Sequence, residues 1–363
     1  MRPLVGSRRS RATRALLLIV ALALLTVGCG ADTPTAASID TLVDIGAGLQ
    51  GPTGLQATVY TQGPEKQSAY AVDDAGRLWV ATADYTDSGS DAVYMVSATG
   101  AAPMKVIAGL HTALGLLWHE GTLYVSSKER VDAYSAFDGT TFASTTEIVA
   151  LPTGVGENNG LAFGPDGRIR LGISAPCDHC TPTSTYSGAV VSFLPDGHDL
   201  HVDASGIRAP VGLAYYPGTA DLFATMNQRD DLGDATPGDT LGLVQAGQHW
   251  GFPDCYGQGG EVCAGVATAT ASLDQHAAVG GVAIVTGQLG ANVGTAAVVA
   301  EWSAGKVQRV ALSTDGASYS ATVTPFLTGF TNPLPIVQLA DGTLLVGDWS
   351  TGTIYQVSAI SPT

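Results

Sequence analysis

The chain has 363 residues, of which 32 are acidic and 16 basic, and its formal net charge is −16. So acidic a chain lacks the basic surface that nucleic acids and anionic lipid faces attract, and we expect neither as a partner. The low share of charged residues (13%) and the 46 glycines favour β structure over long helices.

The first 28 residues are typical of a signal peptide. Five arginines precede an apolar run over residues 15–27, which is shorter than the about 20 apolar residues of a membrane span. The run ends Leu25-Thr26-Val27-Gly28-Cys29, which resembles a bacterial lipobox. We therefore predict a signal peptide over 1–28, a lipidated Cys29 opening a tether over 29–40, and one folded domain over 41–363.

Export follows from this leader. The predicted product is anchored on the outer face of the cell membrane through its lipid alone, and secretion without an anchor is the alternative. Removal of the leader leaves 11 basic and 32 acidic residues, a net charge of −21, which keeps an exported protein soluble. We expect a monomer.

A short unit recurs along the rest of the chain: an apolar strand, a tight Asp-Gly or Pro-Gly turn, and a second strand. Its anchor residues are Leu78, Leu123, Ile169, Leu222, Ala297 and Leu344, at steps of 45, 46, 53, 75 and 47 residues. A four-stranded propeller blade takes roughly 40–50 residues. The sequence therefore predicts an all-β fold, a six-bladed β-propeller, in which residues 55–62 could add a strand to the last blade.

Four cysteines remain after Cys29, an even number that indicates disulfides in an exported chain. Cys177 and Cys180 are expected to form a local disulfide, although a CxxC pair could also be a redox or metal motif. Cys255 with Cys263 would close a glycine-rich loop, and cross pairing between the two pairs stays open.

Polar residues stand where loops enter the predicted innermost strands. They are Glu157, Asn159, Arg208, His276 and Asn332. Such loops converge at one mouth of a propeller's channel, so these side chains could act together, although polar residues at strand entries are also common turn formers.

The middle of the chain resembles the soluble quinoprotein sugar dehydrogenases, the glucose/sorbosone (aldose sugar) dehydrogenase family. The resemblance is carried by Arg208-Ala-Pro-Val-Gly-Leu-Ala, Met226-Asn-Gln-Arg-Asp-Asp-Leu-Gly-Asp, Gly238-Asp-Thr-Leu and Gly247-Gln-His-Trp-Gly-Phe-Pro. It covers nearly all of the chain after the leader. It implies a six-bladed propeller that oxidises a sugar hydroxyl with pyrroloquinoline quinone (PQQ) at the channel mouth and passes the electrons to an external acceptor.

The resemblance also implies roles for individual residues. Arg208 matches the family's PQQ-contacting arginine, and Asn159, His276 and Asn332 are the further candidates for binding the cofactor. Glu157 stands nearest to the position of the family's catalytic histidine. The family's calcium loop falls on Asp231, Asp234 and Asp239, whose carboxylates suit Ca²⁺, although acidic loop residues also occur as solvated surface charges.

Two alternative functions remain open. One follows from positions at which the sequence departs from the dehydrogenase pattern, and the other follows from a resemblance to a second family. No histidine occupies 156 or 157, and Asn332 and Leu334 replace an arginine pair of the family, which favours a non-catalytic propeller that binds a saccharide or another ligand. The string Asn159-Gly-Leu-Ala-Phe-Gly-Pro-Asp-Gly resembles gluconolactonase/regucalcin-type propellers, in which the asparagine ligates a divalent metal. That resemblance implies a metal-dependent lactonase.

Overall fold

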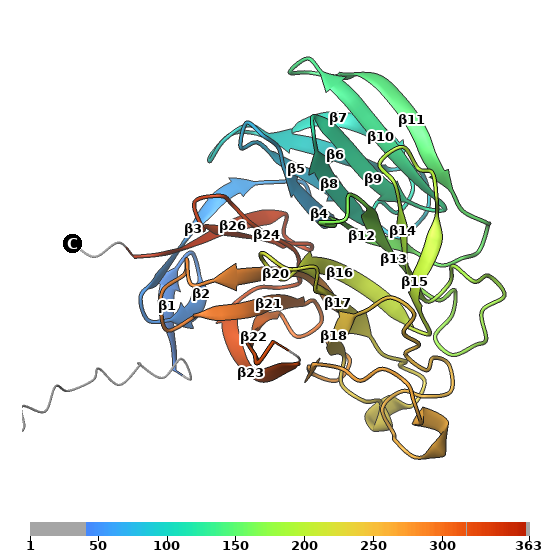
Figure 1. Ribbon diagram of the computed structural model, residues 1–363. Coiled ribbons are helices and arrows are strands. Elements are labelled where there is room, and N and C mark those ends of the chain that lie inside the picture. Colours follow the sequence, from blue (N-terminus) through green and yellow to red (C-terminus); the bar gives the residue numbers. More distant parts are fainter. Residues whose placement is uncertain (1–40, 317, 361–363) are drawn as a thin grey trace, which may run out of the picture. The chain divides into compact units, whose positions relative to one another are not determined.

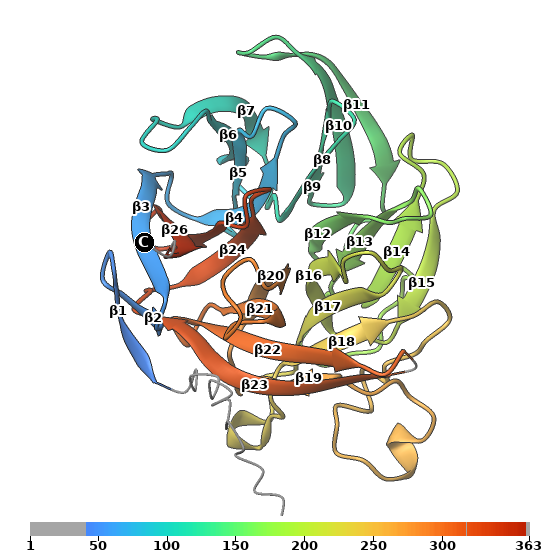
Figure 2. The same ribbon diagram turned by 60° about the vertical axis from the view of Figure 1, so that its left-hand side comes forward.

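A computed structural model describes residues 41–316 and 318–360, in which six sheets surround a common axis (Figures 1 and 2). The predicted all-β, six-bladed β-propeller is confirmed. The signal peptide, Cys29 and the tether lie outside the described residues, so the predicted division of the chain stays a prediction. None of the described helices is long and apolar enough to cross a membrane.

The first three blades are four-stranded antiparallel sheets built in chain order. Blade 1 consists of β4 (Gln67–Val72), β5 (Leu78–Thr82), β6 (Asp91–Val96) and β7 (Met104–Leu110). Blade 2 consists of β8 (Gly115–His119), β9 (Thr122–Ser127), β10 (Arg130–Phe137) and β11 (Phe142–Ala150). Blade 3 consists of β12 (Asn158–Phe163), β13 (Ile169–Ile173), β14 (Ala189–Phe193) and β15 (His201–Ser205).

The last three blades contain elements beyond four strands in chain order: two 3₁₀ turns in blade 4, two extra strands in blade 5, and in blade 6 a strand from the N-terminal part of the domain. Blade 4 has β16 (Ala209–Tyr215), β17 (Leu222–Asn227), β18 (Thr240–Val244) and β19 (Ala271–Ser272), with the 3₁₀ turns η1 (Gly233–Ala235) and η2 (Glu261–Cys263) in its loops. Blade 5 has β20 (Val279–Thr286), β21 (Thr295–Glu301), β22 (Lys306–Thr314) and β23 (Tyr319–Thr328), extended by β2 (Leu49–Pro52) and β1 (Leu42–Gly46). Blade 6 has β24 (Pro333–Gln338), β25 (Leu344–Asp348), β26 (Thr353–Ala359) and β3 (Leu55–Gln62).

The ring closes through β3, which pairs antiparallel with β26 and lies beside it in Figure 2. This strand spans the residues 55–62 that the sequence predicted for the role. Each innermost strand also contacts the innermost strand of the next blade, including β24 against β4. The first and last blades are therefore joined both by backbone pairing and by packing around the axis.

The six predicted anchors all lie on the second strands of the blades, and none is more than 4% exposed. They pack in apolar layers between neighbouring blades, where each buried aliphatic side chain contributes about 1.5–3 kcal/mol. The 75-residue step arises because long loops flank β18 and hold the Cys255–Cys263 disulfide. The β1–β2 hairpin, added to blade 5 at Gln50 opposite Thr328, was not anticipated from the sequence.

Both predicted disulfides are present, Cys177–Cys180 and Cys255–Cys263, so cross pairing does not occur. Disulfides form and persist in oxidising, extracytoplasmic compartments. The covalent structure therefore suggests an extracellular protein.

The innermost strands are irregular near their first residues. In five of the six blades the pairing with the second strand shifts register there, for example between Asn158 and Leu161 in β12 and between Pro210 and Leu213 in β16. A bulge of this kind turns backbone and side chains out of the regular pleat. The bulges lie at the end of the channel where the innermost strands begin.

Candidate functional site

A cavity of about 440 Å³ lies at the end of the channel where the innermost strands begin; we call it the mouth cavity. It lies within the range of roughly 300–1,000 Å³ that is usual for small-molecule sites. The residues that line it are Asp84, Tyr85, Leu114, Glu157, Asn159, Ser174, Arg208, Ala209, Val211, Asn227, Ala278, Val279, Trp302, Leu334 and Trp349. It therefore combines apolar, amide and carboxylate groups from all six blades.

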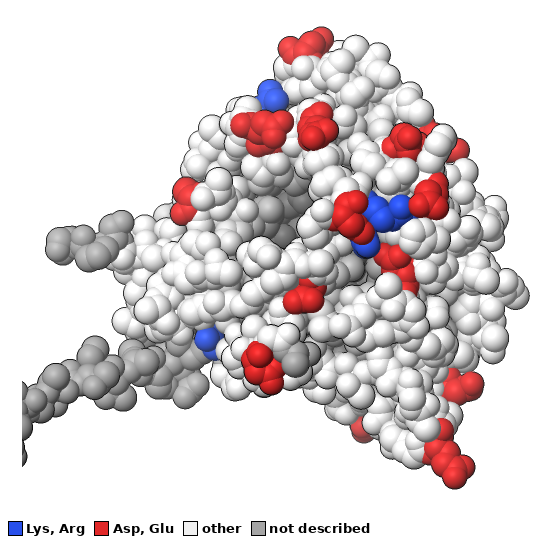
Figure 3. Space-filling view, viewed as in Figure 1, with Lys and Arg blue, Asp and Glu red and all other residues white. Residues whose placement is uncertain are grey.

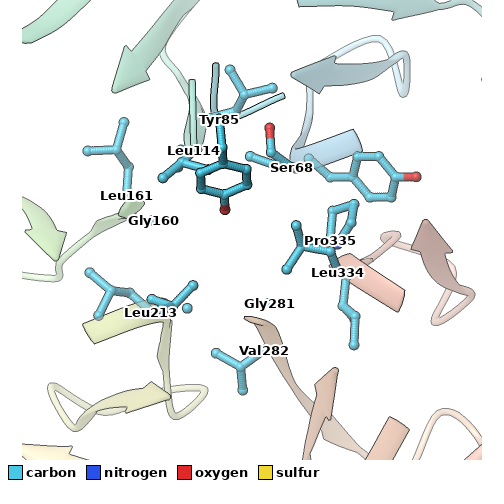
Figure 4. A pocket seen from close by; sticks show the side chains of 17 residues that line it. Ser68, Tyr85, Leu114, Gly160, Leu161, Leu213, Gly281, Val282, Leu334 and Pro335 are labelled. Carbon is cyan, nitrogen blue, oxygen red and sulfur yellow. The ribbon is translucent and has the colours of Figure 1, made fainter. Parts of the chain in front are cut away.

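The channel below the mouth cavity is lined mainly by apolar side chains. Figure 4 shows side chains of the innermost strands, among them Leu161, Leu213 and Val282, around a central space into which Tyr85 projects. Tyr85 also lines the mouth cavity. The space below the mouth cavity is therefore bounded mainly by apolar groups, together with the hydroxyl-bearing side chains Ser68, Tyr70 and Tyr85.

Tyr85 belongs to the loop between β5 and β6, and its backbone is left-handed with φ of 58°. Such a conformation is uncommon outside glycine and costs energy that the surrounding structure must offset. Tyr85 is 54% exposed, and a phenol with the usual pKa of about 10 is protonated at neutral pH. The hydroxyl can therefore donate a hydrogen bond.

Asp84 precedes Tyr85 and organises the same loop. Its Oδ1 accepts hydrogen bonds from the backbone N–H (2.9 Å) and hydroxyl (2.7 Å) of Thr86, and its Oδ2 accepts one from Ser90 Oγ (2.6 Å). The bond from Ser90, and then those from Thr86, lower the pKa of Asp84 to about 2. Asp84 is consequently a permanent negative charge on the cavity wall.

Two tryptophans form another part of the wall. Trp302 follows β21 and Trp349 follows β25, and their rings meet edge to face with centroids 5.7 Å apart. Asn332 links the two loops, because its Nδ2 donates to the carbonyl oxygen of Trp302 (2.9 Å) and its Oδ1 accepts from Ser350 Oγ (2.6 Å). The aromatic pair is thus held by backbone and amide contacts rather than by its own packing alone.

Three of the predicted site residues meet in this cavity: Glu157, Asn159 and Arg208. The Nδ2 of Asn159, which is 3% exposed, donates to Ser174 Oγ and to the carbonyl oxygen of Pro210, both at 2.9 Å. Asn159 thereby ties blade 3 to blade 4. Entry loops of neighbouring blades do converge, as the sequence analysis expected.

The charge of Arg208 is matched by acidic neighbours. Its Nη2 donates to Asp178 Oδ1 at 2.7 Å and lies 3.8 Å from Asp230 Oδ2, while its Nε donates to the carbonyl oxygen of Asp178 at 3.4 Å. Asp178 lies in the loop closed by the Cys177–Cys180 disulfide and also accepts the backbone N–H groups of Asp230 and Asp231. This aspartate therefore joins three parts of the site: the disulfide loop, Arg208, and the loop over residues 228–239 between β17 and β18, which we call the acidic loop.

The structure places the remaining two candidates outside the mouth cavity. Asn332 lies behind the tryptophans, as described above. His276 has its Nδ1 2.8 Å from Asp230 Oδ1 and its Nε2 3.0 Å from the carbonyl oxygen of Gly233. The contact with Asp230, followed by that with Gly233, raises the pKa of His276. Cofactor-binding roles for these two residues stay predictions.

The structure does not bring the predicted calcium ligands together. Asp231 pairs with Arg229 at 2.6 Å, Asp234 lies in η1, and Asp239, the last residue of the acidic loop, is 3% exposed. Over residues 41–316 and 318–360, no group of three or more His, Cys, Asp or Glu side chains is placed to hold a metal ion. Calcium binding by Asp231, Asp234 and Asp239 stays a prediction.

Asp239 should make stability depend on pH. Its carboxylate accepts the backbone N–H groups of Gln228 (2.7 Å) and Val279 (3.4 Å), but burial outweighs these bonds and raises its pKa to about 6. A carboxyl group with a raised folded-state pKa stabilises the fold below its unfolded pKa and loses that contribution as the pH rises through the folded value. Relative to Asp239→Asn, we expect the wild type to lose roughly 2 kcal/mol between pH 4 and pH 7. Denaturant unfolding across this range measures it, and parallel pH profiles would contradict it.

The polar groups of the mouth cavity do not fit PQQ. PQQ is a trianion, and binding it requires several charge-assisted hydrogen bonds. Among the described residues that line the cavity, Arg208 is the one cation, and Asp178 already binds it. Asp84 and Glu157 add two carboxylates, and Lys306 in blade 5 does not line the cavity and is held by Asp274 at 2.5 Å.

Acidic groups dominate elsewhere too. Figure 3 shows one face on which acidic side chains outnumber basic ones, and its largest basic group lies between acidic side chains. In blade 3, for example, Arg168 pairs with Asp199 at 2.8 Å, and Arg170 pairs with Asp166 at 2.5 Å and Asp203 at 2.9 Å. The face shown in Figure 3 is thus acidic, in agreement with the composition.

The ends of the second strands and the loops that follow them were not predicted to reach the site. Asn227 ends β17, and the loops supply Tyr85, Ser174, Trp302 and Trp349 to the cavity. One signal was present, because Glu301-Trp302-Ser303 and Asp348-Trp349-Ser350 repeat an acid-Trp-Ser pattern. Each tryptophan stands five residues after its blade's anchor, which marks it as the same position in two blades.

Comparison with known proteins finds matches among solved structures but none among protein-family models or curated sequences. The PQQ-bound aldose sugar dehydrogenase of Streptomyces coelicolor is 18% identical, with a TM-score of 0.67 over 85% of this chain and 100% of that one. The holo PQQ domain of Coprinopsis cinerea pyranose dehydrogenase is 14% identical, with a TM-score of 0.70 over 85% and 97%.

The apo form of the soluble aldose sugar dehydrogenase of Escherichia coli gives a similar result, with 16% identity and a TM-score of 0.68 over 84% of this chain and 100% of that one. At such identities the likeness establishes a shared fold. The resemblance found in the sequence is therefore confirmed at the level of architecture: the described chain is a propeller like those of the PQQ-dependent sugar dehydrogenases.

Proposed function

We propose that this chain is an exported propeller that binds a saccharide in its mouth cavity. The observation that carries the proposal is the lining: Tyr85, Trp302 and Trp349 offer aromatic surfaces, and Asn159, Glu157 and Asp84 offer polar groups in the same space. Aromatic rings pack on the apolar faces of sugar rings, and amides and carboxylates hydrogen-bond their hydroxyls. The likeness in fold to sugar dehydrogenases agrees with this ligand class.

Removal of either tryptophan should weaken saccharide binding. Trp302→Ala and Trp349→Ala each take away one aromatic surface of the cavity, so we expect about a tenfold loss of affinity, which corresponds to 1.4 kcal/mol. Isothermal titration of the purified chain with a panel of mono- and disaccharides measures the loss.

A matched control is Trp118→Phe, because Trp118 stacks on Trp79 between blades 1 and 2 and does not line the mouth cavity. This variant should bind saccharide as the wild type does. Unchanged affinity in both cavity variants, or absence of binding by the wild type to every sugar on the panel, would contradict the proposal.

Oxidation of the bound sugar with PQQ and transfer of electrons to an external acceptor is the second candidate, favoured by the fold. PQQ-dependent oxidation stays a prediction, because the carboxylates that line the cavity are unfavourable for PQQ, which is itself a trianion. Absorbance titration with PQQ, followed by dye reduction with an aldose panel in the presence of calcium, tests it. The metal-dependent lactonase is a weaker candidate, because no metal-holding cluster surrounds Asn159 in the described part of the chain.

Lipidation of Cys29 belongs to the same proposal. In the producing cell, the wild type is expected in the membrane fraction, whereas Cys29→Ser should appear in the soluble extracytoplasmic or culture fraction, since a lipid chain would be its only anchor. Fractionation with immunoblotting and mass spectrometry of the N-terminal peptide measure this. A wild-type protein found soluble with an unmodified cysteine would support plain secretion instead.

A further inference from the structure

We infer that the ligand of the mouth cavity is an amino sugar, a saccharide that carries a protonated amine. This inference rests on the proposed function and narrows it. It depends on how charge, aromatic rings and hydrogen-bond acceptors are distributed among the residues that line the cavity.

Carboxylates outnumber cations around the cavity. Asp84 and Glu157 line it directly, and Asp178 at 2.7 Å and Asp230 at 3.8 Å lie against Arg208. The cations beside these four carboxylates are Arg208 itself and Lys66, which lies over Trp349. These carboxylates would repel a ligand that carries a carboxylate or phosphate group, whereas they would attract an ammonium group. A neutral sugar would gain nothing from them beyond ordinary hydrogen bonds.

One of the two acidic groups that line the cavity, Asp84, is fixed rather than adaptable. Asp84 is held by Thr86 and Ser90 through three hydrogen bonds of 2.6–2.9 Å, so its carboxylate cannot turn away from the wall without losing them. Because this carboxylate is already ordered, it can pair with an ammonium ion without the loss of side-chain entropy that a mobile carboxylate would suffer.

The aromatic wall suits a cation as well as a sugar ring. Among aromatic side chains, tryptophan attracts ammonium groups most strongly. Lys66 Nζ already lies over the Trp349 ring, 5.5 Å from its centroid, so we assign the ligand's ammonium group to the ring of Trp302. The pyranose ring of the same ligand would pack on either tryptophan.

The acidic groups of the wall also suit a hydrogen-bond donor. The ionised carboxylates that Asp84 and Glu157 bring to the cavity accept hydrogen bonds and donate none. An ammonium group brings three N–H donors and no acceptor.

The test compares two ligands with the same sugar skeleton, the β-1,4-linked glucosamine disaccharide, whose amines are protonated, and its neutral N,N′-diacetylated form, by isothermal titration at pH 6. We expect the free amine form to bind about tenfold more tightly, with the difference falling several-fold in 0.5 M NaCl because salt screens charge. Glu157→Gln should reduce the preference several-fold. The control Glu120→Gln, in the exposed turn between β8 and β9, should leave it unchanged.

Each outcome bears on one of the two claims. If the diacetylated form binds as tightly as the free amine or more tightly, the amino-sugar inference is overturned, and saccharide binding stands. If the free amine form is preferred but Glu157→Gln and Glu120→Gln behave alike, the inference is also overturned, because the cavity charges do not cause the preference. If no saccharide binds, the proposed function itself fails.

Discussion

Replacement of Asp178 with asparagine is expected to free Arg208 to bind an anion in the mouth cavity. In the wild type, the Asp178 carboxylate pairs with this arginine. Asp178 contacts Arg208 twice, through its carboxylate at 2.7 Å and its carbonyl oxygen at 3.4 Å. Asparagine keeps an oxygen to accept the N–H groups of Asp230 and Asp231, so the loop should persist while the charge disappears. Affinity for PQQ, measured by absorbance titration, should rise at least about tenfold over the wild type.

The control uses an equivalent ion pair elsewhere in the propeller. Asp166→Asn removes a carboxylate that pairs with Arg170, which lies on blade 3 and does not line the mouth cavity. It should leave PQQ binding as weak as in the wild type. The double variant Asp178→Asn/Arg208→Gln should cancel the gain. Equal affinity of Asp178→Asn and the wild type would mean that this ion pair does not keep the cofactor out.

The fold could be predicted because its signal is periodic and local. Each anchor, such as Leu78 or Leu344, lies beside its own Asp-Gly or similar turn, and a strand needs only its own alternation and turn to be recognised. The strand over residues 55–62 that closes the ring was also recognisable, because the last blade needs an added strand. The β1–β2 hairpin carries no repeat signal, and its docking on β23 depends on a single pairing, Gln50 with Thr328.

The site could be predicted only where the repeat fixes position. Glu157, Asn159 and Arg208 stand next to innermost strands, and they do meet at the mouth. Trp302 and Trp349 lie in loops after the second strands, and those loops differ in length from blade to blade, so their reach cannot be judged from spacing. The repeated acid-Trp-Ser pattern identifies the two positions as equivalent, but it does not show that they face the axis.

The pairing of Arg208 with Asp178 is the feature that the sequence could not show. The two residues are 30 positions apart, and strands β14 and β15 and a blade boundary lie between them. An arginine in a string that resembles the family was therefore expected to contact a cofactor, whereas its neutralisation by Asp178 depends on a tertiary contact. Charge balance in a cavity has to be judged from all the elements that surround it.

Loss of Asp348 should destabilise the propeller and disorganise the aromatic wall together. Asp348 ends β25, is 0% exposed, and accepts four backbone N–H groups: Thr331 (2.6 Å), Asn332 (3.2 Å), and Ser350 and Thr351 (both 3.1 Å). Asp348→Ala leaves all four donors without this acceptor. We expect a loss of about 3–5 kcal/mol, which lowers the melting temperature by roughly 6–15 °C.

The same carboxylate joins the loop that carries Trp349 to the loop that enters β24, so its removal should also weaken saccharide binding in whatever fraction stays folded. Asp348→Asn, which keeps one acceptor oxygen, should lose about half as much stability. Asp341→Ala is the matched control, because Asp341 accepts one N–H, from Thr343 at 2.9 Å, in an exposed turn of the same blade. Calorimetry ranks the three variants, and an Asp348→Ala protein as stable as Asp341→Ala would show that water or backbone adjustment replaces the carboxylate.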